Sequence, residues 1–590
     1  MPKVVSVFER AKEYDDEGFY VFSKEKGIMM CKFCNVQVDW KRKDTYEKHC
    51  KFRASHKVNK DRCQASGSGT KRQVTLEENI STHKKTKNEK TKLAEDTVRA
   101  FVKANIPLQK LNHPAIREWL NEYVKGSGDL PQAHTLRTTY LQSLKMEEEE
   151  KVKLAVKDQQ VVVLCDETTN RRGECVFVVL FKVLLASGDS KLLVAGVKVL
   201  SNANSTECSR AVVETLIKYN VKYENVCAFV SDSAKYMNKC AELLKVLVGE
   251  NMLYIQCWAH KLNLVGNVWS TELTTLNECV VKAKMAFLNT RKRKHHYLDF
   301  LKKSSVEPKL FPSPVLTRWN SWFTSVTYLD KYLVHLVEFF RQQDFDGADA
   351  TEYFKSLSTD QVLVLQCEAK FVVEYCKKTV DLLECLEGSS YPFAHKLCVK
   401  LSDLKTGFKL VSDRNFGGET AKLLNSAACL KAATGAKLAV TGQKSFLKLS
   451  SLMGGDPAKS FLENIGFLFN PREIISRGPE IDAVNLQNRV QAVPLLRDIT
   501  FQKFLDGYAA TKHAVLKSEI GKVDMLRVLL SLKNDFPEFS DSAIKCLWLP
   551  VSNVDSERAF SAYSNIMSDK RTSLGAENME IMLAMCFGGD

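Results

Sequence analysis

The spacing of hydrophobic residues changes along this chain and predicts three kinds of region. From about Leu93 to Leu144, apolar residues recur at helical spacing, which predicts a small helical domain. From about Asp158, short runs rich in Val, Leu and Phe predict strands. From Leu273 to about Phe536, helical spacing returns almost throughout. The chain should therefore hold a strand-containing region between helical ones.

The strand-containing region is expected to form a mixed sheet. The predicted strands are 161–165, 174–185, 191–200, 226–231 and 252–256. The predicted helices are 209–219, 235–248 and 259–268 in this region, with 317–342 and 362–387 as examples further on. Three linked strands followed by alternating helices and strands indicate a mixed sheet with helices packed on it.

Composition excludes two broad classes of protein. The chain has 590 residues, 45% of them hydrophobic, which is enough for several domains with buried cores. The densest apolar stretch, Val176–Ala186, contains Lys182 and is too short to span a bilayer, so a membrane protein is not expected. The N-terminus lacks the apolar segment of a secretion signal, and the eighteen cysteines indicate free thiols or metal ligands. A secreted disulfide scaffold is not expected either.

The positive charge is concentrated near the N-terminus. The net charge is +15, and the window from Lys41 to Lys92 holds sixteen Lys/Arg against six Asp/Glu, a local excess of ten. Such a cation field suits a polyphosphate partner, because each neutralised phosphate releases counterions. Lys41, Arg42 and Lys43 are the candidate DNA contacts. The alternative is a solvated linker without a specific partner, since residues 61–92 are polar and contain a Ser-Gly-Ser-Gly run.

A candidate zinc site lies beside this basic window. Cys31 and Cys34 are separated by two residues, and His49 and His56 follow them. Two thiolates and two imidazoles suit a closed structural Zn²⁺ site, and metal binding would supply most of the folding energy of so short a unit. The six residues between the histidines exceed the usual three to five, so Cys50 is an alternative ligand. An ordinary buried cysteine pair is the other interpretation.

The N-terminal part resembles two related groups of proteins. Residues 28–60 are similar to a BED-type zinc finger. Residues 28–60 and 98–141 resemble the CGG triplet-repeat-binding family. The second of these matches is carried by Lys103-Ala-Asn-Ile-Pro-Leu-Gln-Lys, His113-Pro-Ala-Ile-Arg and Leu136-Arg-Thr-Thr-Tyr-Leu. This resemblance implies DNA binding and ends near the start of the predicted sheet.

Two carboxylates follow predicted strands directly. Asp166 comes after the first strand and Asp232 after the fourth. Ligand-binding groups collect at the carboxyl edge of such sheets, and two acids there could hold a hard cation such as Mg²⁺. A helix cap or a turn is the more common role for a single Asp in this position.

The C-terminal region resembles the hAT transposases. The resemblance is carried by Ser552-Asn-Val-Asp-Ser-Glu-Arg-Ala-Phe-Ser561 with Lys570, Arg571, Leu574 and Asn578 beyond it. Four earlier motifs match the family in the same order: Cys165-Asp-Glu-Thr-Thr, Ser231-Asp-Ser-Ala, Cys257-Trp-Ala-His260 and Thr317-Arg-Trp-Asn320. In that family the signature helix bears the last acid of an Asp-Asp-Glu triad, and Glu557 occupies the matching position.

The resemblance implies a fold and a chemistry. Asp166, Asp232 and Glu557 would bind catalytic Mg²⁺ or Mn²⁺ in a ribonuclease H-like core. Asp232 and Glu557 are 325 positions apart, so a large all-helical domain must be inserted between them. The implied reactions are cutting of double-stranded DNA at transposon ends, hairpin formation on flanking DNA, and joining of the freed 3′ end to target DNA.

Three further residues take roles from the same resemblance. His260 matches a residue near the scissile phosphate, Arg318 a phosphate contact, and Trp319 an aromatic that stacks on a flipped base. A core histidine is the alternative interpretation for His260, and a helix-capping or core tryptophan is the alternative for Trp319. Cys257 and His260 could also be half of a zinc site, although no second half lies nearby in the sequence.

The expected fold class is a multidomain α+β and α protein. Its expected parts are a BED-like zinc finger (1–60), a basic flexible linker (61–92), a small helical DNA-binding or dimerisation domain (93–150), the first part of the core (151–272), an all-helical insertion (273–536), and the last part of the core with the dimerisation region (537–590). The expected function is a nuclear, homodimeric or larger hAT-type transposase. The alternative is a domesticated copy that regulates transcription by binding DNA.

Overall fold

The computed structural model describes most of the chain. The described residues are 5–15, 18–23, 26–52, 54–65, 76–124, 130–185, 187–314, 319–342, 349–388, 391–426, 428–519, 521–567 and 574–587. They fall into two compact units, residues 1–91 and 92–590, and each unit is described by itself. Among the described helices, none combines the length and the apolar character that crossing a membrane requires.

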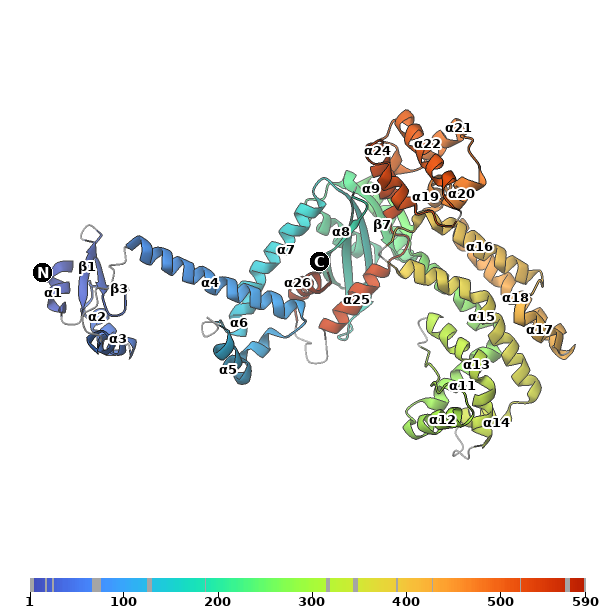
Figure 1. Cartoon of the computed structure of the whole chain (residues 1–590), viewed down its shortest axis with the longest axis horizontal. Coiled ribbons are helices and arrows are strands. Elements are labelled where there is room, and N and C mark those ends of the chain that lie inside the picture. The colour runs from blue at the N-terminus through green and yellow to red at the C-terminus, as the bar shows by residue number, and fades with distance from the viewer. Residues whose placement is uncertain are drawn as a thin grey trace. The chain divides into compact units, whose positions relative to one another are not determined.

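The first unit is built on a small antiparallel sheet (Figure 1). Its elements are α1 (Val7–Glu13), β1 (Phe19–Ser23), β2 (Ile28–Cys31), β3 (Val36–Val38), α2 (Lys43–Phe52) and α3 (Ala54–Ala65). Asn35 takes a positive φ of 51°, which closes the tight turn between β2 and β3. Phe19, Met29 and Val38 are buried in a core of only a few side chains. The finger thus has a three-stranded sheet in the order β1-β2-β3.

The polar stretch 61–92 is largely helical where it is described. Helix α3 continues to Ala65, and α4 (Leu76–Lys103) begins eleven residues later. Residues 66–75, which include the Ser-Gly-Ser-Gly run, lie outside the described residues. Lys, Glu and Ala are good helix formers, so a polar composition alone does not make a segment irregular. The flexible linker expected over 61–92 therefore differs from the structure at both of its ends.

The second unit begins with the expected helices. After α4 come η2 (Leu108–Asn112), α5 (Pro114–Tyr123), α6 (Ala133–Thr135), η4 (Leu136–Tyr140) and α7 (Leu141–Val156). Val98, Val102 and Leu111 are fully or almost fully buried among them. Arg117 of α5 donates hydrogen bonds of 2.7 and 2.8 Å to the carbonyls of Leu130 and Pro131. These bonds hold the segment before α6 against α5.

A five-stranded mixed sheet follows, as predicted. Its strands are β4 (Gln160–Thr169), β5 (Cys175–Leu184), β6 (Ser190–Leu200), β7 (Val226–Ser231) and β8 (Leu253–Gln256), in the order β6-β5-β4-β7-β8. The strands β6, β5 and β4 are antiparallel neighbours, whereas β7 and β8 join parallel to β4. This order arises because β4, β5 and β6 are consecutive antiparallel neighbours, whereas β7 and β8 each follow a helix that crosses over the sheet.

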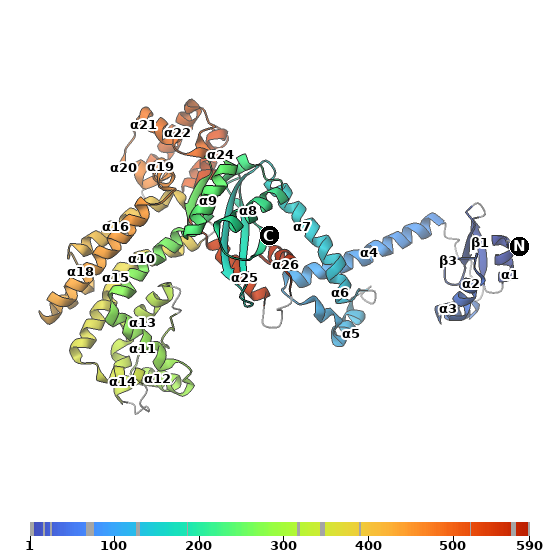
Figure 2. The same cartoon turned by 180° about the vertical axis from the view of Figure 1, so that it is seen from behind.

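Alternation along β4 divides the core into two faces. Val161, Val163 and Cys165 pack in one cluster with α8 (Ser205–Lys218) and α9 (Lys235–Val248). Val162 and Leu164 belong to the other cluster, which includes residues of α24 (Pro537–Trp548), α25 (Val554–Ile566) and α26 (Ala576–Phe587). Figures 1 and 2 show α25 and α26 on one side of the sheet and α8 and α9 on the other. The sheet is therefore covered on both faces by segments distant in sequence.

Between β8 and α25, the described residues form helices and connecting loops. The longer helices are α10 (Trp258–Glu272), α11 (Thr274–Phe287), α12 (Arg291–Lys303), α13 (Trp319–Gln342), α15 (Thr359–Glu387), α16 (Ala394–Ser412), α18 (Ala428–Gly454), α19 (Lys459–Phe469) and α22 (Phe501–Lys517). The shorter ones are α14 (Asp349–Ser356), α17 (Gly418–Ser426), α20 (Pro471–Ser476), α21 (Ala483–Gln491), η6 (Pro494–Leu496) and α23 (Met525–Ser531). The helical character expected for 273–536 is confirmed.

Candidate functional site

The carboxyl edge of the sheet gathers the two predicted aspartates. Strands β4 and β7 are parallel neighbours whose last paired residues are Leu164 and Val230. Asp232 directly follows β7, whereas Asp166 lies within β4, which runs on to Thr169 and not to the predicted end at 165. Each aspartate is two residues beyond the last pair, so both lie at the same edge. The Asp166 carboxylate accepts a hydrogen bond of 3.0 Å from the backbone N–H of Glu167. The Asp232 carboxylate accepts one of 3.1 Å from the N–H of Ala234, where α9 begins. Asp232 thus also has the local turn contact expected for an ordinary Asp, whereas Asp166 lies within a strand.

The segment before α25 is attached to the same edge by three hydrogen bonds, and a fourth lies within the segment. The N–H of Trp258 donates to the carbonyl of Val551 at 3.0 Å. The Asn553 backbone N–H donates to the Cys257 sulfur at 3.1 Å, and its side-chain amide donates to the Cys165 carbonyl at 2.8 Å. The Ser556 hydroxyl donates to the Asn553 side chain at 2.8 Å. These bonds hold the N-terminus of α25 next to Cys165 of β4.

Glu557 is exposed in the first turn of that helix. Burial raises the pKa of Asp166 well above its usual range, and the negative charges of Glu167, Asp232 and Glu557 raise it further. Asp232 and Glu557 therefore both lie close enough to Asp166 to affect its ionisation. In the described residues, the three acids do not form a cluster of metal-ligating atoms like that of Cys31, Cys34, His49 and His56.

Glu167 is an acid at this edge for which sequence reasoning assigned no role. Because side chains alternate along a strand, it lies on the opposite face from Asp166, and it accepts a hydrogen bond from the hydroxyl of Tyr236 on α9. Burial raises the pKa of Glu167 to about 7, and the charge of Asp232 adds to that effect. The sequence could have pointed to Glu167, because it directly follows Asp166 in the Cys-Asp-Glu-Thr-Thr motif.

The remaining candidate residues of the site are His260, Arg318, Trp319 and Cys257. His260 is exposed in the first turn of α10, three positions after Cys257. Arg318 lies outside the described residues, and Trp319 is described only as the first residue of α13. Cys257 is buried against Asn553, and within the described ranges it does not join a cluster of metal-ligating side chains.

The finger brings together its four predicted ligands. The ligand atoms of Cys31, Cys34, His49 and His56 all lie within 4.8 Å of one another. The His56 Nδ1 atom is 3.4 Å from each of the two sulfurs. A tetrahedral zinc ion, with bonds of about 2.3 Å to sulfur and about 2.0 Å to nitrogen, places such ligands about 3.5 Å apart. The donor set and its spacing fit Zn²⁺.

The surroundings of this cluster also suit a metal. Burial raises the pKa of the Cys31 thiol, so the protein alone disfavours the thiolate that a metal requires. A bound dication reverses that preference. The two histidines are almost fully buried, at 8% and 1% exposure, whereas Cys50 packs against the small core of the finger and is not part of the cluster.

The candidate DNA contacts lie between β3 and α2. Lys41 and Arg42 are exposed, and Lys43 is the first residue of α2, with a side chain that is not described. Their position after β3 and at the start of α2 makes them part of the folded finger.

Comparison with known families divides the chain into three matched regions. Residues 1–61 match the CGGBP1 N-terminal domain, and residues 84–143 match the CGGBP1 helical domain. Residues 504–586 match the hAT family C-terminal dimerisation region, which therefore begins in α22, before the expected boundary at 537. The ring centroids of Phe504 and Phe539 are 5.2 Å apart, so α22 packs directly on α24.

Two curated relatives match the N-terminal part. The CGG triplet repeat-binding protein 1 of Mus musculus and that of Homo sapiens are each 30% identical to this chain over 137 residues. The aligned region covers 78% of each relative and 23% of this chain.

The fold and the matched regions define a multidomain protein with CGGBP1-type domains, a mixed-sheet core and an hAT dimerisation region. Through its N-terminal part, the chain belongs to the family of the CGG triplet repeat-binding proteins. The C-terminal match adds a link to hAT transposases and to homo-oligomers.

Proposed function

We propose that this protein is an hAT-type DNA transposase with a ribonuclease H-like, metal-dependent core. The observation that carries the proposal is the position of Asp166 and Asp232, each two residues beyond the last paired residues of the parallel strands β4 and β7, with Glu557 brought to the same edge on α25. The match of residues 504–586 to the hAT dimerisation region supports it independently.

The three acids would hold Mg²⁺ or Mn²⁺, since hard cations prefer oxygen ligands. When bound, such ions lower the pKa of an attacking water or 3′-hydroxyl and stabilise the departing oxygen. The contribution of the chain is to hold its carboxylates in place, through β4, β7 and the contacts of Asn553. Closure around the ions requires the carboxylates to approach one another, which neutralisation of their charges favours.

The substrate of this core would be the ends of a transposon in double-stranded DNA. Cleavage, hairpin formation on flanking DNA and joining of the 3′ end to target DNA follow from the resemblance. His260 would lie near the scissile phosphate, Arg318 would contact phosphate, and Trp319 would stack on a flipped base. The protein would act in the nucleus as a homodimer or larger assembly.

The first unit would deliver the core to DNA. Zn²⁺ held by the two cysteines and two histidines would fix the finger, and Lys41, Arg42 and Lys43 would neutralise phosphates. The similarity to a CGG triplet repeat-binding protein favours a second candidate function, a domesticated regulator that binds DNA without cutting it.

Cleavage by the purified full chain distinguishes the two functions. With Mn²⁺ and a labelled duplex bearing the terminal repeats that flank the gene, we expect nicking at the repeat ends. Asp232→Asn and Glu557→Gln should abolish nicking, whereas Glu577→Gln, an exposed acid on α26, should retain it. Nicking that survives Asp232→Asn would rule out the proposed core. Absence of nicking together with retained DNA binding would favour the regulator.

DNA binding is measured separately through its salt dependence. If six to ten phosphates are neutralised, affinity should fall about 10³- to 10⁵-fold between 50 and 200 mM salt. Replacing Lys41, Arg42 and Lys43 with Ala should flatten that slope, whereas the same change at Lys191, Lys235 and Lys239, exposed lysines of the core, should not. A slope that is the same in both triple variants would count against these contacts.

A further inference from the structure

Lys182 occupies a position in β5 where an apolar side chain is expected. Alternation places it on the same face as Leu180 and Leu184, which are both completely buried. It lies opposite Val162 of β4 and Leu192 of β6, and only 6% of it is exposed. A lysine in the middle of a central strand therefore needs a reason other than packing.

The positive charge of Lys182 is not balanced by a direct partner. In the described part of the chain, its ammonium group makes neither an ion pair nor a hydrogen bond; it lies 5.4 Å from the centre of the Trp548 ring. Asp555 and the exposed Asp189 are the negative groups that act on it from nearby, and the Asp555 carboxylate is paired with Arg558 at 2.9 Å. Lys182, Asp555 and Arg558 together therefore carry one net positive charge. Burying such a charge costs several kcal/mol.

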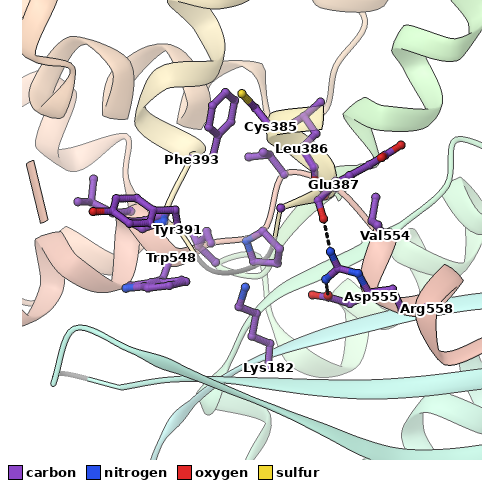
Figure 3. Close-up of a pocket in the computed structure, with 17 residues that line it drawn as sticks. Lys182, Cys385, Leu386, Glu387, Tyr391, Phe393, Trp548, Val554, Asp555 and Arg558 are labelled. Atoms are coloured by element: carbon purple, nitrogen blue, oxygen red, sulfur yellow. Dashed lines mark hydrogen bonds and ion pairs between the residues drawn. The ribbon is translucent and has the colours of Figure 1, made fainter. Parts of the chain in front are cut away.

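A small pocket with a cavity volume of about 30 Å³ lies at this charge (Figure 3). Its floor is β5, and its walls come from the end of α15, the start of α16 and the connection between α24 and α25. Figure 3 shows the Lys182 ammonium pointing into the pocket, Tyr391 and Trp548 on one side, and the Asp555–Arg558 pair on the other. The Glu387 carboxylate, the other acid of the pocket, points away from Lys182.

The walls of the pocket are fixed by their own hydrogen bonds. The indole N–H of Trp548 donates to the Gly188 carbonyl at 3.1 Å, and Arg558 donates to the Glu387 carbonyl. The Ser552 hydroxyl donates to the Leu386 carbonyl at 2.8 Å. These contacts leave the Lys182 ammonium as the charged donor that remains available in the pocket. Burial lowers the pKa of Lys182 and the nearby Asp555 opposes that effect, so a bound anion would stabilise the charged form.

We propose that this pocket is an anion-binding site that takes one singly charged phosphate group on Lys182. The ammonium group of Lys182, which has no direct partner in the described residues, suits one negative charge, such as that of a phosphodiester or of monoanionic inorganic phosphate. The proposal does not depend on metal-dependent cleavage, because binding is measured without a catalytic metal.

Calorimetry on the full chain tests the site with two probes, the dinucleotide dTpdT and inorganic phosphate, at constant ionic strength. Lys182→Met keeps the length of the side chain and removes its charge, and it should weaken binding about tenfold or more, since hydrogen bonds to charged groups contribute about 1.5–3 kcal/mol. Lys191→Met, an exposed lysine on the neighbouring strand, is the matched control and should bind like the wild type. Tighter binding of dTpdT than of phosphate identifies a strand as the source, and the reverse order identifies the free ion.

Two further measurements separate binding from stability. Lys182→Met should raise or preserve the melting temperature without ligand, because it removes an uncompensated buried charge. If the variant instead melts at a lower temperature while binding is unchanged, Lys182 is structural and the proposal fails. In the wild type, dTpdT or phosphate should slow acetylation of Lys182 but not of Lys191, as followed by mass spectrometry. Equal acetylation rates with and without both probes would overturn the proposal.

Discussion

The side-chain amide of Asn553 donates a hydrogen bond of 2.8 Å to the backbone carbonyl of Cys165, 388 positions earlier in the chain. Cys165 directly precedes the first predicted catalytic acid, and Asn553 lies four positions before the last. The bond therefore joins the two ends of the candidate site across the whole helical insertion.

Asn553→Ala should loosen this junction. The variant removes the donor to the Cys165 carbonyl and the acceptor of the Ser556 hydroxyl, both buried. Leaving such groups without partners costs about 1–3 kcal/mol each, so the free energy of unfolding should fall by about that amount or more. Urea unfolding measures it, with Asn202→Ala, an exposed loop residue, as the control. Equal stability of both variants would show that the bond does not hold α25 in place.

The proposed zinc site predicts a contrast between two cysteines of the finger. Cys34→Ser should abolish bound zinc and unfold residues 20–60, because a metal would carry most of the folding energy of so small a core. Cys50→Ser should retain one zinc per chain, because Cys50 lies outside the ligand cluster. Metal analysis of the purified protein and proteolysis of the finger are the measurements. Loss of zinc in Cys50→Ser would instead make Cys50 the fourth ligand.

Glu167 predicts a pH dependence of stability in the absence of divalent cations. Its pKa rises from 4.5 to about 7 on folding, so between these values the folded protein binds more protons than the unfolded chain. Stability from this group is therefore complete below about pH 4.5 and is lost as the pH rises through 7.

Glu167→Gln should remove that contribution. Glutamine keeps an acceptor for the Tyr236 hydroxyl but does not titrate. Melting temperatures between pH 4.5 and 7.5 should show a flatter profile for the variant than for the wild type, whereas Glu577→Gln should leave the profile unchanged. Parallel profiles of wild type and Glu167→Gln would contradict the assignment.

Two ion pairs join α10 to α18 and to the loop that follows α18. Because one pair is buried and the other is exposed, we expect their removal to lower the free energy of unfolding by different amounts. Lys261 and Asp456 pair at 2.7 Å with 2% exposure on each side, whereas Lys444 and Glu272 pair at 2.7 Å with 52% and 20% exposure. Removing one partner of a buried pair costs about 3–5 kcal/mol, and an exposed pair contributes about 1 kcal/mol or less.

Lys261→Met should therefore destabilise the protein far more than Lys444→Met. The double variant Lys261→Met with Asp456→Asn should recover part of the loss, because no charge is then left buried without a partner. Denaturant unfolding of the four proteins, wild type included, gives the comparison. Similar effects of the two single variants would mean that burial does not set the strength of these pairs.

The local features of the protein were accessible from the sequence. The strands follow from runs of β-branched and aromatic residues, and the helices from apolar spacing, so β7 and α9 have the predicted bounds. The four ligands of the finger follow from residue type and spacing, since only a few side chains can bind zinc. Helix α3 and the start of α4 were missed, because their charged sequences were interpreted as solvated linker.

The sequence by itself determined which residues can do chemistry; the tertiary structure decided which of them meet. Nothing local indicates that Asn553 reaches Cys165, or that Lys182 faces Trp548 and Asp555, since each pair is separated by more than 350 positions. Lys182 was visible in the sequence as a lysine within an apolar stretch, but its missing partner was not. The physical reason is that secondary structure depends on neighbours along the chain, whereas charge balance and burial depend on neighbours in space.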